Sequence, residues 1–78
     1  MYFCEISVPL KSKEVDIVYN AVVPEFSSIQ DDRAKSKITK NENKLELSIE
    51  AQDITSLRSA VNSHLRYIKL SLDTLEAN

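Results

Sequence analysis

Apolar side chains recur at every second residue from Tyr2 to Leu10. Apolar residues occupy the even-numbered positions, with Glu5 and Ser7 between them. This period of two is typical of a strand with one buried face, and it predicts a strand from Tyr2 to Leu10. Pro9 lacks a backbone N–H, so the strand is expected to end there or to lie at a sheet edge.

The next segment repeats its apolar residues at helical spacing, which predicts a helix from Lys13 to about Val23. Ser12 is expected to cap it, and Glu14 lies in the first turn, where the helix dipole favours an acid. Pro24 is expected to stop it, leaving residues 24–32 as a loop anchored by Phe26 and Ile29. The predicted core stripe consists of Val15, Val18, Tyr19 and Val22.

Two further runs predict a hairpin. The run from Arg33 to Lys40 is weakly apolar and rich in lysine, as expected of a protected sheet edge. The run from Lys44 to Ala51 alternates regularly between apolar and polar residues. The connecting Asn41 and Asn43 favour a turn, because asparagine tolerates left-handed backbone conformations.

The last segment carries the longest periodic pattern in the chain. Asp53 is expected to cap a helix of about six turns, and a polar stripe that includes Lys69 lies beside its apolar residues. The predicted core stripe consists of Ile54, Leu57, Val61, Leu65, Ile68, Leu72 and Leu75.

These elements predict one α+β domain spanning residues 1–78, in the order β-α-β-β-α. A helical crossover makes the first two strands parallel, so the third can insert between them and pair antiparallel with both. The expected result is a three-stranded antiparallel sheet with two helices on one face. The opposite face carries polar side chains and is expected to be solvated.

Composition narrows the function. The chain has 78 residues, a net charge of −2, one cysteine, one histidine and no glycine. Phosphate-binding glycine loops and the glycine loop of KH domains are therefore excluded, and no cofactor or structural zinc site is expected. The core of so short a chain is marginal, which favours burial against a partner.

The N-terminal residues lack the basic and apolar runs of a signal peptide, and no window is long enough to span a membrane. We therefore expect a cytoplasmic protein without membrane association. Cys4 is expected to be a small core residue on the inner face of the first strand.

Three stretches resemble the Pcc subunit family of the KEOPS complex: the basic strand at 33–38, the strand ending in Ala51-Gln52-Asp53, and the last helix. The last helix is the most specific part, with Leu57-Arg58 followed by Asn62-Ser63-His64-Leu65-Arg66. The resemblance covers nearly the whole chain. The glycine-free hairpin departs from the family pattern.

The resemblance implies a non-catalytic subunit that forms a homodimer and docks its helices on the Kae catalytic subunit. That enzyme transfers a threonylcarbamoyl group to adenosine in tRNA. In eukaryotic complexes a different small protein takes the dimerising side. The alternative is an independent nucleic-acid-binding or transcription-regulatory domain of similar topology.

Both predicted helices carry residues that one core does not explain. Ile17 and Ala21 form a second apolar strip on the first helix. On the last helix, Arg58 and its polar neighbours are open to two interpretations, as partner contacts or as an ordinary solvated face. The candidate partner-binding residues are Ile17, Ala21, Arg58, Ala60, Asn62, His64, Arg66, Tyr67, Leu70 and Ser71.

His64 lacks the partners of a general base, so we expect a packed or interfacial histidine and no enzyme active site. The basic residues around the hairpin are candidate tRNA contacts, although acids lie among them and no aromatic platform accompanies them. The alternative is edge protection by lysine. These cations are Arg33, Lys35, Lys37, Lys40 and Lys44.

Overall fold

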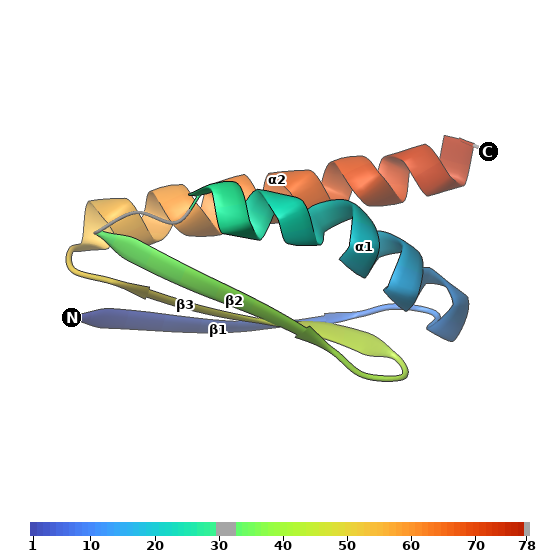
Figure 1. Ribbon diagram of the computed structural model, residues 1–78, viewed down its shortest axis with the longest axis horizontal. Coiled ribbons are helices and arrows are strands. Elements are labelled where there is room, and N and C mark those ends of the chain that lie inside the picture. Colours follow the sequence, from blue (N-terminus) through green and yellow to red (C-terminus); the bar gives the residue numbers. More distant parts are fainter. Residues whose placement is uncertain (30–32, 78) are drawn as a thin grey trace.

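The computed structural model describes residues 1–29 and 33–77, and it has two layers: a sheet of three strands and a pair of helices over one of its faces (Figure 1). The elements follow the predicted order. They are β1 (Tyr2–Pro9), α1 (Ser12–Ile29), β2 (Ala34–Lys40), β3 (Lys44–Ala51) and α2 (Ile54–Ala77).

The sheet has the predicted topology, with β3 in the middle and both of its neighbours antiparallel to it. In β3, Leu47 lies opposite Ile6 of β1 and opposite Ile38 of β2. Because side chains alternate across a strand, this register puts all three on the covered face. The fold class predicted from the sequence is confirmed.

The two helices divide that face between them. α1 contacts β2 and β3, whereas α2 contacts all three strands and is the helix above β1. The core therefore lies between the sheet and the two helices, with β3 at its centre. Its buried apolar residues are Val15, Val18, Val22, Phe26, Ala34, Ile38, Leu45, Leu47, Ile49, Ala51, Ala60 and Ile68.

The predicted end of the first helix was wrong. Pro24 lies inside α1, which runs on to Ile29. A proline in a helix removes one backbone hydrogen bond, but Phe26, two residues later, is buried to 3% exposure. Burial of an aromatic ring offsets the lost hydrogen bond. Residues 30–32 of the expected loop and the side chain of Ile29 lie outside the described part.

The start of α1 also differs from the prediction. The helix begins at Ser12 itself, so the preceding residue, Lys11, occupies the capping position. The Lys11 N–H donates to Oε1 of Glu14 at 3.2 Å. This is the carboxylate half of a capping box, and it replaces the expected Ser12 cap.

The cap of α2, just after β3, depends on a hydrogen bond to a short side chain. Oδ1 of Asp53 accepts the Ser56 N–H at 2.7 Å, which confirms the predicted cap of α2. Hydrogen bonds from the backbone and hydroxyl of Ser56, and then the nearby Arg33, hold the pKa of Asp53 below its usual value.

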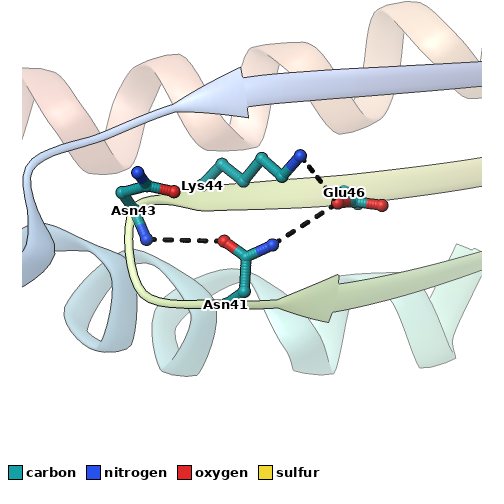
Figure 2. A network of polar contacts seen from close by, with 4 residues as sticks. All are labelled: Asn41, Asn43, Lys44 and Glu46. Atoms are coloured by element: carbon teal, nitrogen blue, oxygen red, sulfur yellow. Dashed lines mark hydrogen bonds and ion pairs between the residues drawn. The ribbon is translucent and has the colours of Figure 1, made fainter.

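The hairpin turn uses the two predicted asparagines in a different way. Asn41 Oδ1 accepts the Asn43 N–H at 3.4 Å, and the Asn41 amide donates to Oε1 of Glu46 at 3.5 Å (Figure 2). No non-glycine residue in the described ranges has a positive φ. The expected left-handed asparagine was therefore wrong, and side-chain hydrogen bonds close the turn instead.

The predicted core stripe of the last helix was partly wrong. Ile54 is 50% exposed and Leu65 is 38% exposed, whereas Ala60, His64 and Ile68 are buried. The buried direction of α2 is rotated toward α1 relative to the stripe of large apolar residues. The helix turns a small residue and a histidine inward, and large aliphatic residues remain on its outer flank.

Candidate interaction surfaces

A groove between α1 and α2 brings together apolar residues of both helices that are 42 or more positions apart in the sequence. Its volume is about 360 Å³. Ile17 on α1 is 51% exposed and Leu70 on α2 is 55% exposed. The lining residues are Ile17, Ala21, Val22, Glu25, Tyr67, Leu70, Ser71, Thr74 and Leu75.

Helical spacing explains how each wall of the groove forms. Ile17 and Ala21 are four residues apart and share one flank of α1, beside the buried Val18 and Val22. On α2, Leu70 and Thr74 are also four apart, and the Thr74 hydroxyl donates to the Leu70 carbonyl at 2.9 Å. The small Ala21 and Ser71 leave room for an incoming side chain.

Half of the candidate partner-binding residues meet in this groove. All of them are residues that the core predicted from the sequence did not require. Glu25, Thr74 and Leu75 also line it and were not predicted as site residues; their helical spacing from Ala21 and Leu70 is the signal that could have found them. The predicted residues that the groove brings together are Ile17, Ala21, Tyr67, Leu70 and Ser71.

Ala60 and His64 do not belong to an exposed surface. Ala60 is 5% exposed and His64 is fully buried in the core of the chain itself. Their assignment as partner contacts was wrong, because both side chains lie on the face of α2 that packs against the core. The other three candidates, Arg58, Asn62 and Arg66, are exposed on α2 and do not line the groove.

His64 is a packed histidine. Its Nε2 lies 2.7 Å from the Ser36 Oγ, and its ring stacks on Phe26 with centroids 3.9 Å apart and an interplanar angle of 11°. The Nδ1 atom is buried and has no hydrogen-bond partner among the described residues. Burial lowers the pKa of His64, so the neutral form is favoured. Ser36 and His64 are both buried, so the pair belongs to the packing between β2 and α2.

Comparison with known proteins decides the family. The family model described as "Transcription factor Pcc1" matches residues 3–76, which run from β1 to the end of α2. The chain belongs to the Pcc1 family. A KEOPS complex subunit Pcc1 from Pyrococcus abyssi (strain GE5 / Orsay) is 33% identical over 72 residues. The match covers 91% of this chain and 88% of that relative.

Membership of the Pcc1 family confirms the resemblance found in the sequence. The matched range includes both walls of the groove between α1 and α2, and it includes the whole hairpin. The family therefore accounts for the entire two-layer fold.

The five candidate tRNA contacts of this Pcc1-family chain fall into two groups. Lys40 pairs with Asp16 of α1 and lies 4.9 Å from the centroid of the Tyr19 ring. Lys44 pairs with Glu46 at 3.2 Å (Figure 2). Lys40 thus pairs with another element and Lys44 with a residue of its own strand, and each pairing reduces the charge that the lysine offers to a phosphate.

The remaining basic residues lie on β2 or just before it. Lys35 and Lys37 are exposed on the open face of the sheet, two residues apart and therefore on the same side of the strand. Arg33 precedes the strand and acts electrostatically on Asp53. The structure thus brings Lys35 and Lys37 together as an exposed pair.

A second, more polar cavity was not predicted. It has a volume of about 540 Å³ and lies where the start of α1 meets the hairpin turn. Because Asp16 and Lys40 are 24 residues apart, no local sequence pattern indicates it. Its lining residues are Ser12, Val15, Asp16, Lys40, Asn41 and Glu42.

The described residues form neither a metal-binding cluster nor a membrane-spanning helix. Across 1–29 and 33–77, no three histidine, cysteine, aspartate or glutamate side chains are grouped so that they could hold a metal ion. Neither helix, over its described length, is apolar enough to cross a membrane.

Proposed function

We propose that this chain is a non-catalytic subunit of a KEOPS complex. In this proposal it self-associates, docks the groove between α1 and α2 on the Kae catalytic subunit, and so supports the formation of threonylcarbamoyladenosine in tRNA. The observation that carries the proposal is the match along 91% of the chain to a KEOPS complex subunit.

The chemistry of the groove supports the docking part of this proposal. Ile17 and Leu70 are large aliphatic side chains, each about half exposed, on facing walls of one groove. Monomeric surfaces rarely gather such residues without a partner. Tyr67 is half-buried and lines the same groove, where it adds the kind of aromatic contact that often dominates interface energetics.

The family description supports a second function, because it names a transcription factor. Direct binding to nucleic acid depends on unpaired positive charge. The net charge is −2, and Lys40 and Lys44 already pair with acids. These charges favour the complex subunit over an independent nucleic-acid-binding domain.

The test is a titration of the purified chain with its catalytic subunit. We expect Leu70→Glu to weaken binding by about 30-fold or more, because an interface anchor contributes about 2 kcal/mol or more. Its thermal unfolding midpoint is expected to change little, because Leu70 is 55% exposed. Ile17→Asp should behave in the same way from the other wall.

Leu65→Glu is the matched control. Leu65 is an exposed leucine of the same helix, but it does not line the groove. The control should bind the catalytic subunit with unchanged affinity. If Leu70→Glu binds as well as the unmodified chain, docking through the groove is wrong. If the chain binds free nucleic acid tightly and does not bind the catalytic subunit, the second function is correct.

A further inference from the structure

His64 is a basic residue in a core that has no acceptor for a second proton on its ring. Its side chain is fully buried, and its Nε2 lies 2.7 Å from the Ser36 Oγ. Its Nδ1 is buried as well and has no hydrogen-bond partner among the described residues. A neutral imidazole carries one N–H, which the Ser36 hydroxyl can satisfy. Histidinium carries two, so its Nδ1–H would be left buried without an acceptor. The closed core therefore favours the neutral ring strongly.

No charged side chain shares the core with this ring. Among the described residues, Ser36 and His64 are the only polar side chains that are buried. Burial lowers the pKa of His64, and no described carboxylate lies close enough to oppose it. The charged residues within two positions of Phe26, Ser36 or His64 lie beside the groove on α1, on the open face of β2 and on the exposed side of α2. They are Glu25, Lys35, Lys37 and Arg66, and the acids of β3, Glu46 and Glu50, also point to the open face.

The ring is covered by a part of α1 that follows a weak point in the helix. Phe26 stacks on His64, with ring centroids 3.9 Å apart and an interplanar angle of 11°. Pro24, two residues earlier, has no N–H to donate to the Asn20 carbonyl one turn back. The part of α1 beyond Pro24, up to Ile29, is therefore joined to the rest of the helix by one hydrogen bond fewer than usual. Among its described side chains, Phe26 is the one that is buried.

We propose that protonation of His64 releases Phe26 and opens the end of α1 at Pro24. In the closed state the neutral ring holds Phe26 by stacking. In the open state the ring reaches water, which solvates both N–H groups of histidinium. The other two elements around the ring keep their places, because β2 is paired along its length with β3 and α2 is an uninterrupted helix of 24 residues. The change is therefore confined to the residues after Pro24.

Opening also changes one wall of the groove between α1 and α2. Glu25 lines that groove and lies between Pro24 and Phe26, so it moves with the opened segment. Ile17 and Ala21 precede Pro24 and keep their positions. Acidification is thus expected to displace one end of the α1 wall and to leave its apolar part. The effect on docking rests on the proposed function, whereas the opening of α1 does not.

The pH range of the opening follows from the usual pKa of histidine. A solvated ring is half protonated at its usual pKa of 6.5, whereas the buried ring stays neutral to a lower pH. The closed state is therefore favoured above pH 6.5 and loses ground as the pH falls. The ratio of open to closed chains should rise about tenfold between pH 7.5 and pH 5.5. Aspartate and glutamate titrate near pH 4, below this range.

Fluorine NMR on the full chain, labelled with 4-fluorophenylalanine, tests the opening. The chain has two phenylalanines, so the spectrum contains one resonance from Phe26 and one from Phe3. The Phe26 resonance should move toward that of the free amino acid between pH 7.5 and pH 5.5, because its ring leaves the stack. Phe3 is 68% exposed and is the internal control, whose resonance should not change. Circular dichroism of the same samples should retain most of the helical signal.

Two variants assign this change to the ring and to the weak point of α1. His64→Gln keeps an amide that can bond to Ser36 but takes up no proton, so its Phe26 resonance should not depend on pH in this range. Pro24→Ala restores the N–H that reaches the Asn20 carbonyl. At pH 5.5 its ratio of open to closed chains should therefore be about tenfold lower, or less, than in the unmodified chain.

Three outcomes would overturn the inference. The first is a Phe26 resonance that stays unchanged down to pH 5.0. The second is a change that coincides with loss of the circular dichroism signal, because the whole chain then unfolds. The third is a Pro24→Ala variant that opens as readily as the unmodified chain. Pro24 is exposed, so this variant tests the opening even where His64→Gln is too unstable to fold.

Titration with the catalytic subunit tests the effect on the groove. From pH 7.5 to pH 5.5, the affinity of the unmodified chain should fall by up to about tenfold more than that of His64→Gln. An equal dependence on pH in both chains would overturn the link to the groove. Absence of binding at either pH would instead contradict the proposed function. The fluorine measurement uses the chain alone, so it decides the opening of α1 in either case.

Discussion

The two faces of the sheet are formed by the same strands but differ in burial. In β3, Leu45, Leu47 and Ile49 face the helices and are at most 1% exposed. The intervening Glu46 and Ser48 are exposed on the open face. A shift of one position along the strand therefore moves a side chain from the centre of the core into solvent.

This contrast shows where stability and recognition reside. The covered face holds nearly all of the buried apolar area, which is the main source of folding free energy. The open face holds charges that contribute little to stability, because solvent screens them. Substitutions on the open face can therefore change what the protein binds without unfolding it.

The largest expected effect comes from substituting neighbouring residues of β3. Leu47→Ala should lower the free energy of unfolding by about 2–5 kcal/mol, because it opens a cavity at the centre of the core. Ser48→Ala, on the open face, should change it by less than about 0.5 kcal/mol. Chemical denaturation of both variants measures the difference. Equal losses would show that both faces are buried, as in a sheet covered on its second side.

A change in pH is expected to have an intermediate effect on the free energy of unfolding, because His64 is a titratable residue buried between the helices and the sheet. Its pKa in the folded state lies below the usual 6.5, so the unfolded state binds the proton more readily. Stability contributed by the neutral ring is present above pH 6.5 and is lost as the pH falls from 6.5 toward the folded-state pKa. The loss should reach at most about 1.4 kcal/mol per pH unit.

Denaturation at pH 7.5 and pH 5.5 measures this dependence, and His64→Gln should flatten it. Asp53 does not interfere, because the effect of its lowered pKa falls below the ordinary value of 3.8. An unmodified chain whose stability is the same at both pH values would show that His64 is already solvated or paired through Nδ1.

The smallest effect on stability is expected on the open face of β2. Lys35→Gln combined with Lys37→Gln should shift the free energy of unfolding by less than about 0.5 kcal/mol. The same variant separates the two interpretations of these lysines. If they contact tRNA phosphates in the assembled complex, the slope of log affinity against log salt should fall by about one for each lysine. An unchanged slope would show that Lys35 and Lys37 do not contact tRNA and would favour their role in protecting the sheet edge.

The sequence by itself determined the order of the elements and the strand faces. β3 runs from Lys44 to Ala51 as predicted, because its alternation of apolar and charged residues suits only one face inward. The Asp53 cap could also be predicted from the sequence, because it depends on residues only three positions apart. Five residues of the groove could also be named in advance, since they were apolar or small at positions that a single core did not need.

Only the tertiary structure decided which direction of α2 faces inward, whereas the predicted inward residues Val15, Val18 and Val22 of α1 are buried. The periodicity of α2 is satisfied by several neighbouring stripes, and packing against α1 selected the one through Ala60, His64 and Ile68. Packing likewise carried α1 past Pro24, because burying Phe26 on His64 outweighs a missing hydrogen bond. Such choices depend on contacts between residues far apart in the chain, and local sequence patterns do not contain them.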